Sequence, residues 1–122
     1  MSLIPNFNTN GIVTRPAAAA IQKGQALKLA TGGGVTPCAL ASDKALYIAQ
    51  YDAAAGQNVA CGVLGNINGT TFILATAALA PGDPVGVLGQ VAATGAMCVG
   101  LAVTSAKVGE YCEIAHRAAS PI

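Results

Sequence analysis

The chain has 122 residues, a length that suits one domain with a single hydrophobic core. Hydrophobic residues make up 53% of it and charged residues 9%, whereas an average soluble domain has roughly 25% charged residues. The net charge is +1 without a run of one sign, aromatic residues are 4% and tryptophan is absent, which argues against the basic patches and stacking surfaces that bind nucleic acid. A surface this short of charge favours burial against partners, so we expect an oligomer or a bound state.

The first 16 residues show neither helical nor strand periodicity and are rich in Asn and Thr. They also carry more apolar side chains than a disordered tail usually does. We interpret 1–16 as an extended arm that lies on another surface and 17–122 as one folded domain; a first strand of the domain's own sheet and a loose tail are the alternatives. The residues predicted to contact the partner are Leu3, Ile4, Pro5, Phe7, Ile12 and Val13.

The N-terminal segment lacks a basic stretch followed by an apolar run, so we expect no secretory signal. The longest apolar stretch, 72–80, is far shorter than the about 20 residues that a membrane helix needs. We therefore expect a protein that is made in a cytoplasm and has no membrane partner.

Two pairs of segments indicate an internal repeat. Segment 21–29 aligns with 79–87 through Gly24 and Gly82, each followed by alternating apolar residues. Segment 48–61 aligns with 101–114 through Gly56 and Gly109. The offset is 58 residues in the first pair and 53 in the second, so the second copy is five residues shorter in its middle, where a connecting region tolerates loss. The chain is predicted to contain two degenerate copies of one β unit.

Three consecutive glycines, Gly32, Gly33 and Gly34, follow the first alternating segment. A phosphate-binding loop would need a helix after them, because the amides at a helix N-terminus hold the anion. Instead "VTPCAL" follows, and it contains no Lys-Ser or Lys-Thr pair. We predict a hairpin turn, with a flexible loop or a ligand cradle of another kind as alternatives.

Short apolar segments separated by turn residues are typical of a small β-barrel or sandwich. Strands are predicted at 25–30, 34–38, 46–50, 58–65, 70–75, 84–88, 90–93, 97–103 and 110–115. Turns are predicted at Gly32 to Gly34, Asn68-Gly69, Pro81-Gly82-Asp83, Gly89 and Gly95. Segments 52–56 and 104–109 each suit one helical turn. The predicted fold is all-β with minor helical turns: a small barrel built from two repeats.

No group of residues predicts catalysis or metal binding. The four cysteines lie far apart without a Cys-x-x-Cys pair, so neither a zinc site nor a disulfide framework is indicated; they are Cys38, Cys61, Cys98 and Cys112. On a strand, the only histidine, His116, would lie about 13 Å from Cys112, too far for a nucleophile and its base. Glu110 and Glu113 would face opposite ways, and Asp83 suits a turn. We predict no enzyme activity, no cofactor and no metal.

Four segments in a fixed order carry a family resemblance: "KGQALKL" at 23–29, "IAQYDAAAGQNVACGVLG" at 48–65, "LAPGDPVGV" at 79–87 and "VGLAVTSAKVGEYCEI" at 99–114. Together they resemble the small capsid decoration, or cement, proteins of tailed bacteriophages. The likeness covers roughly 20–115, and the order and spacing of the Gly/Ala-rich motifs carry it. It implies a compact barrel-like fold called a β-tulip and assembly as homotrimers.

The resemblance also implies a function. Such proteins bind the outside of an expanded phage head after synthesis in the host cytoplasm, and bridge neighbouring copies of the major capsid protein. In related proteins an N-terminal arm adds a strand to the capsid lattice, and the arm here matches by position only. Two other readings remain open: a phage tail or tube subunit, which would form rings or tubes in isolation, and a small ligand-binding barrel, which would show exposed aromatic residues.

Overall fold

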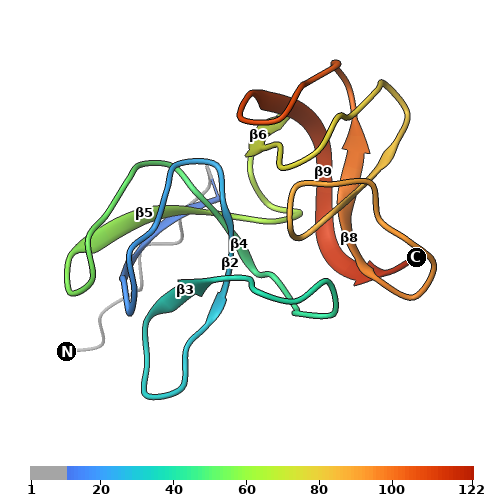
Figure 1. The fold of residues 1–122 in the computed structure, drawn as a ribbon. Helices are drawn as coiled ribbons and strands as arrows, with labels where there is room; N and C mark the ends of the chain where they lie inside the picture. The colour runs from blue at the N-terminus through green and yellow to red at the C-terminus, as the bar shows by residue number, and fades with distance from the viewer. Residues whose placement is uncertain (1–10) are drawn as a thin grey trace, which may run out of the picture.

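The computed structural model describes residues 11–122, which form nine strands (Figure 1). The strands are β1 (Ile12–Pro16), β2 (Ala26–Leu29), β3 (Val35–Pro37), β4 (Tyr47–Ala49), β5 (Asn58–Val63), β6 (Thr71–Leu74), β7 (Pro84–Gly86), β8 (Met97–Ala102) and β9 (Tyr111–Pro121). Within this range no helix is long and apolar enough to cross a membrane. The predicted all-β fold is confirmed.

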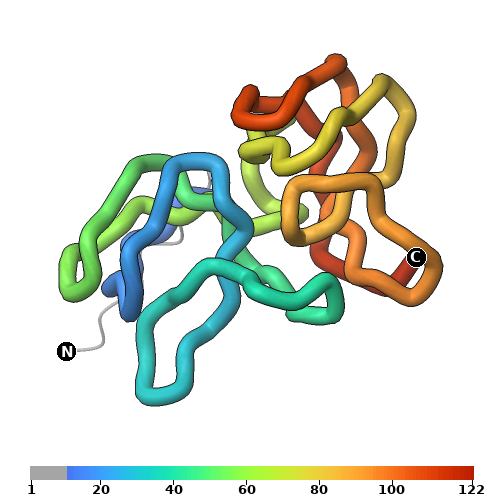
Figure 2. Tube along the Cα trace, viewed as in Figure 1, coloured from blue at the N-terminus to red at the C-terminus, as the bar shows by residue number. Residues whose placement is uncertain are grey.

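The strands form two antiparallel sheets, ordered β1-β5-β4-β2-β3 and β6-β9-β8-β7. Figures 1 and 2 show them as two lobes that lie side by side. We call 11–63 the first lobe and 71–122 the second lobe; the linker 64–70 joins them.

The two sheets repeat one pairing scheme, which confirms the predicted repeat. In the first sheet β1 pairs with β5, β5 with β4, and β4 with β2. In the second sheet the corresponding pairs are β6 with β9, β9 with β8, and β8 with β7. The registers agree residue by residue at the offsets of 58 and 53: Ile48 lies opposite Gly62, and Leu101 lies opposite Ala115.

The loops repeat as well. The Ile21 N–H donates to the Ala53 carbonyl at 2.8 Å, and the Leu79 N–H donates to the Ala106 carbonyl at 2.9 Å. These bridges correct the helical turns expected at 52–56 and 104–109, because Ala53 and Ala106 are held in extended pairings. A β-turn follows each bridge instead.

Each sheet is curled but open, so the predicted small all-β domain does not form a closed barrel. In the first lobe a single bridge, Ala17 to Val35, joins the two edges of the sheet. In the second lobe the Thr76 N–H reaches the Gly89 carbonyl at 2.9 Å. Neither contact extends into a ladder of paired strands among the described residues, so the fold is two curled sheets.

The glycine run forms the β2–β3 hairpin turn, as predicted. The Gly33 N–H donates to the Ala30 carbonyl at 3.1 Å, and Gly32, Gly33 and Gly34 have φ of 91°, 104° and 77°. A Cβ on Gly34 would lie 2.5 Å from the Pro16 carbonyl oxygen, so only glycine fits there.

The other predicted turn glycines also have positive φ: 76° at Gly69, 89° at Gly82, 79° at Gly89 and 87° at Gly95. In contrast, the strand predicted at 90–93 is reduced to a single bridge between Val91 and Val85. The second hairpin is shorter than the first, which leaves no room for a full strand.

The predicted arm is wrong for its last five residues, because Ile12–Pro16 form β1 at the edge of the first sheet. Ile12 and Val13 lie opposite Gly62 and Cys61 of β5 and are half-buried. The repeat carried the signal: at an offset of 58, 12–16 align with 70–74, which was predicted as a strand. The other predicted contact residues, Leu3, Ile4, Pro5 and Phe7, lie outside the described residues.

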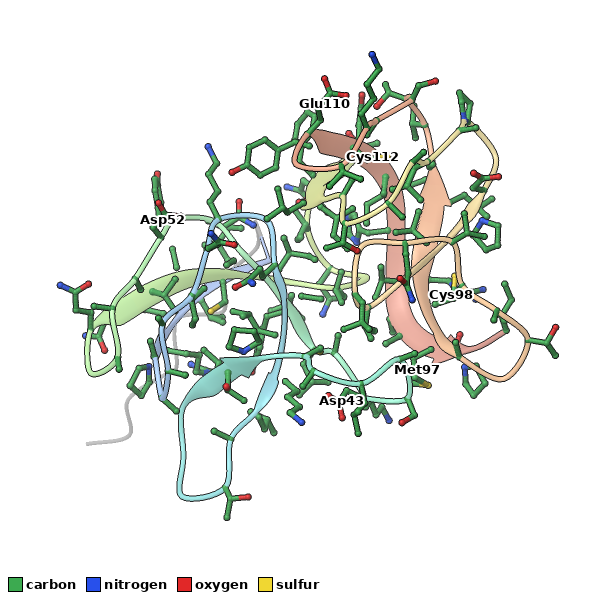
Figure 3. The ribbon with its side chains drawn as sticks, viewed as in Figure 1. Asp43, Asp52, Met97, Cys98, Glu110 and Cys112 are labelled. Atoms are coloured by element: carbon green, nitrogen blue, oxygen red, sulfur yellow. The ribbon has the colours of Figure 1, made fainter. Side chains whose placement is uncertain are left out.

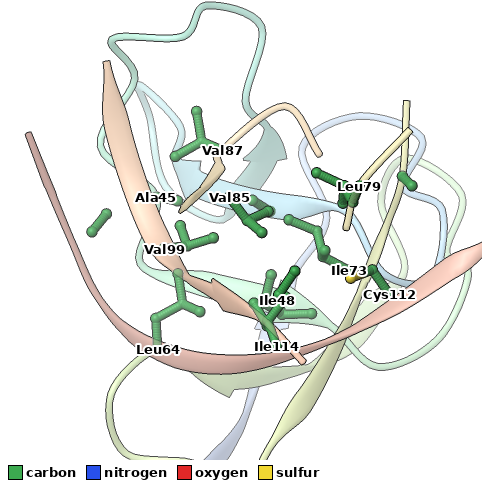
Figure 4. Packing of buried hydrophobic residues seen from close by; sticks show 14 of the residues in the cluster. Ala45, Ile48, Leu64, Ile73, Leu79, Val85, Val87, Val99, Cys112 and Ile114 are labelled. Carbon is green, nitrogen blue, oxygen red and sulfur yellow. The ribbon is translucent and has the colours of Figure 1, made fainter. Parts of the chain in front are cut away.

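The core has two parts. One cluster lies inside the first lobe and is built by alternating residues such as Val59 and Cys61 of β5. The larger cluster fills the second lobe and also takes in Ala26, Ala45 and Ile48 from the first lobe (Figure 4). The outer side of the first sheet therefore packs on the second lobe.

Candidate interaction surfaces

His116 holds the linker and does not face a nucleophile. Its Nδ1 accepts a hydrogen bond from the Gly65 N–H at 2.9 Å, and its Nε2 lies 3.0 Å from the carbonyl oxygens of both Ile67 and Gly69. These partners place the ring proton on Nε2. The sequence predicted only that His116 lies too far from Cys112 for catalysis, and the linker contacts were missed because no local motif points to partners this far away in the sequence.

The cysteines are free thiols, three of them buried and Cys38 half-buried. Burial raises the pKa of Cys38 to about 11, with the nearby Asp43 carboxylate adding to the rise. Burial likewise raises the pKa of Cys61 to about 11. The Cys112 Sγ donates to the Thr104 carbonyl at 3.2 Å, and burial raises its pKa too. A thiol that stays protonated is a poor nucleophile and a poor metal ligand.

The acidic residues singled out from the sequence serve turns and strand contacts. Asp83 accepts the Ala80 N–H at 2.8 Å, as predicted for a turn residue. Glu110 accepts the Lys107 N–H at 2.7 Å, and Glu113 accepts the Thr70 hydroxyl at 2.6 Å. Within 11–122, no three His, Cys, Asp or Glu side chains gather as a metal site would require.

The second sheet exposes apolar side chains on the side away from its core. Strand alternation places these residues on one face, which we call the outer face: Phe72, Leu101, Val103, Tyr111 and Ala115. Phe72 and Leu101 are 54% and 52% exposed, and Tyr111 and Val103 are 46% and 44% exposed. Glu113 lies among them, opposite Phe72. A group of exposed apolar side chains of this kind is typical of an interaction surface.

A notch of about 280 Å³ separates the outer face from the first lobe; its lining includes Lys23, Gly24, Gln50, Phe72 and Tyr111. The Leu74 N–H donates to the Gly24 carbonyl at 2.8 Å, which joins β6 to the first lobe. The Lys23 ammonium lies 5.9 Å from the centre of the Tyr111 ring. Asp52, labelled in Figure 3, accepts the Lys23 N–H at 2.7 Å and fixes this loop.

A shallow hollow of about 430 Å³ lies on the first lobe, lined by Lys28, Leu29, Lys44 and Leu46. Leu29 is 58% exposed. Lys28 forms an ion pair with Asp43 at 3.0 Å, and the amides of Leu40 and Ala39 together with Lys28 lower the pKa of the Asp43 carboxyl. The loop that contains Asp43 also reaches the second lobe, since the Met97 N–H donates to the Ala41 carbonyl at 3.0 Å (Figure 3).

No known family model matches the chain, and no curated protein matches it. The fold, however, is similar to that of a bacteriophage head-fiber base. The crystal structure of the head fiber gp8.5 N base of bacteriophage phi29 superposes on 91% of this chain and 98% of its own, with a TM-score of 0.67 and 18% sequence identity. At this identity the likeness concerns the fold.

Sequence reasoning missed the outer face and the hollow. A signal was present in "MCVGLAV" at 97–103, where apolar residues occupy both faces of the strand. An antiparallel strand with one solvated face would alternate between apolar and polar residues, so apolar residues on both faces indicate a second packing partner.

Proposed function

We propose that this protein is a structural component of a bacteriophage virion, which binds the outer surface of the head and cements neighbouring copies of the major capsid protein. The observation that carries the proposal is the fold, shared over 91% of the chain with a phage head-fiber base. The ordered motifs that resemble capsid decoration proteins support it independently.

The surface suits such a role. Charged residues are only 9% of the chain, and exposed apolar side chains gather on the outer face and in the hollow. Two such surfaces would be poorly hydrated in a monomer, so we further propose a homotrimer in which at least part of them is covered. A protein that binds only the assembled shell stabilises that shell by its binding free energy, about 2.7 kcal/mol per site at a free concentration one hundred times the Kd.

The N-terminal residues Leu3, Ile4, Pro5 and Phe7 are proposed to contact the capsid. An extended segment can add a strand to an exposed sheet edge through main-chain hydrogen bonds, and apolar side chains then fix its register. Because Ile12 and Val13 belong to β1, the proposal is limited to the residues before that strand.

The test uses purified protein and phage heads that lack it. The protein should sediment with expanded heads in a saturable, symmetric ratio and should raise the temperature at which the heads release DNA. Unexpanded procapsids and an unrelated protein of similar size are the controls. Absence of binding to expanded heads of the phage that encodes this protein would refute the proposal.

The same fold likeness supports a second role, as the base that anchors a fiber on the head. The two roles differ in stoichiometry. A cementing protein covers the junctions between capsid subunits all over the shell, whereas a fiber base occupies only the positions that carry fibers. Counting bound copies per head separates the two.

A further inference from the structure

The repeat shows what the outer face corresponds to in the first lobe. Ala26 pairs with Ile48, and at the repeat offsets Pro84 pairs with Leu101. Ile48 is 0% exposed and Ala26 is 3% exposed, but Leu101 is 52% exposed. The same position of the same unit is therefore covered in one lobe and open in the other.

The cover in the first lobe comes from the second lobe. Ile48 belongs to the core cluster that contains Val87 and Val99, with Met97 packed against its edge. Figure 4 shows Ile48 together with the second-lobe side chains of this cluster. Within the chain, the outer side of one unit thus packs on the core side of the next unit.

Part of the cluster that contains Ile48 also has a counterpart in the first lobe. At offsets of 58 and 53, Val87, Met97 and Val99 correspond to Leu29, Lys44 and Leu46 of the first lobe. These are three of the four residues that line the hollow. Val87 is 3% exposed and Val99 is 0% exposed, while Leu29 is 58% exposed. The first lobe therefore leaves open the counterparts of three residues that belong to the cluster around Ile48 or pack against it.

We propose that the outer face of one copy docks into the hollow on the first lobe of another copy, which repeats between chains the packing seen between the lobes of one chain. The contact is head-to-tail, so it generates a closed ring when the rotation between copies closes. The proposal rests on the self-association proposed above and assigns its two surfaces. Charges agree with it, since Glu113 lies on the outer face and Lys44 lines the hollow.

Thiol cross-linking distinguishes this contact from others. Leu29→Cys and Leu101→Cys are prepared as separate proteins in a Cys38→Ala background, because the other native thiols are buried. A short bis-maleimide should join the two proteins only when they are mixed. Neither variant alone should cross-link, and neither should a mixture of Leu29→Cys with Val108→Cys, an exposed position outside both surfaces.

Charge variants provide the second measurement. Leu101→Lys and Leu29→Asp should each raise the concentration for half-assembly by at least about tenfold in sedimentation velocity, since the first places an ammonium against Lys44 of the hollow and the second places a carboxylate against Glu113 of the outer face. Val108→Asp, at a side chain that is 70% exposed, should leave it unchanged. Circular dichroism should show the same fold in all three variants.

Each alternative outcome has a definite meaning. Cross-linking of Leu101→Cys with itself would reveal a two-fold contact and overturn the proposal. If the unmodified protein assembles but the mixed sample gives no cross-link, the outer face and the hollow do not form the contact between copies, and the proposed self-association still stands. A monomer both in free solution and on heads would overturn the proposed self-association and, with it, the two proposed contact surfaces. Loss of head binding by Leu101→Lys with unchanged assembly would assign the outer face to the capsid instead.

Discussion

A matched pair of glycine substitutions tests how the lobes are joined. Gly24 and Gly82 occupy the same position of the repeat and have nearly the same φ, 87° and 89°. A Cβ on Gly82 would meet no atom within 4 Å, whereas a Cβ on Gly24 would lie 2.7 Å from the Tyr111 ring and 3.0 Å from the Leu74 nitrogen. Gly82→Ala therefore reports the backbone cost alone, and Gly24→Ala adds the cost of disturbing the contact between the lobes.

The magnitudes follow from these contacts. An alanine with a left-handed backbone costs about 1–2 kcal/mol relative to glycine, which is the expected loss for Gly82→Ala. In Gly24→Ala the Tyr111 ring must also move, and the bond from the Leu74 N–H to the Gly24 carbonyl is weakened, which adds about 1–2 kcal/mol. Gly24→Ala should therefore lower the free energy of unfolding by about 2–4 kcal/mol.

Urea unfolding followed by circular dichroism measures both values. Repeating the pair in a Tyr111→Ala background should remove most of the difference, because the ring no longer blocks the added methyl group. Equal losses for Gly24→Ala and Gly82→Ala in the parent protein would refute the lobe contact described here. An undiminished difference in the Tyr111→Ala background would refute the role of the ring.

Three further outcomes are expected. Removal of 1–10 should leave the melting temperature nearly unchanged and weaken attachment to heads, whereas removal of 1–16 should destabilise the domain because β1 is lost. Equal melting temperatures for the two truncated proteins would contradict the assignment of β1. The free energy of unfolding should fall as pH rises from about 9 to about 11, because the unfolded chain loses the Cys61 proton first and the folded chain retains it up to a pKa of about 11. A Cys61→Ala variant should show a shallower fall in urea titrations across that range. Exchanging His116 for Ala should cost about 1–3 kcal/mol and speed hydrogen exchange at the Gly65 amide, and unchanged exchange there would rule out the linker contact.

Much of the fold follows from local sequence signals. Alternation around Val59 and Cys61, and again around Cys112 and Ile114, predicted two strands that the structure contains. The glycines at fixed positions predicted the turns and revealed the repeat. Local signals were sufficient for these elements because alternation and turn conformation are set by neighbouring residues, although the strands then pair at long range, as Ile12 does with Gly62.

The association of the two units could not be predicted in this way. Ile48 and Leu101 are both large aliphatic residues at the same repeat position, yet one is buried and the other is exposed. The difference arises only from which unit has a neighbour on that side. The helical turns at 52–56 and 104–109 failed for a related reason, since the bridges from Ile21 and Leu79 override the local preference.

A reconstruction by electron cryomicroscopy of expanded heads incubated with this protein tests directly whether it binds the head surface. The proposed function predicts added density on the outer surface, placed over contacts between major capsid subunits and fitted by the two curled sheets of residues 11–122. Bare heads, or density confined to the tail or the interior of the shell, would contradict the proposed function.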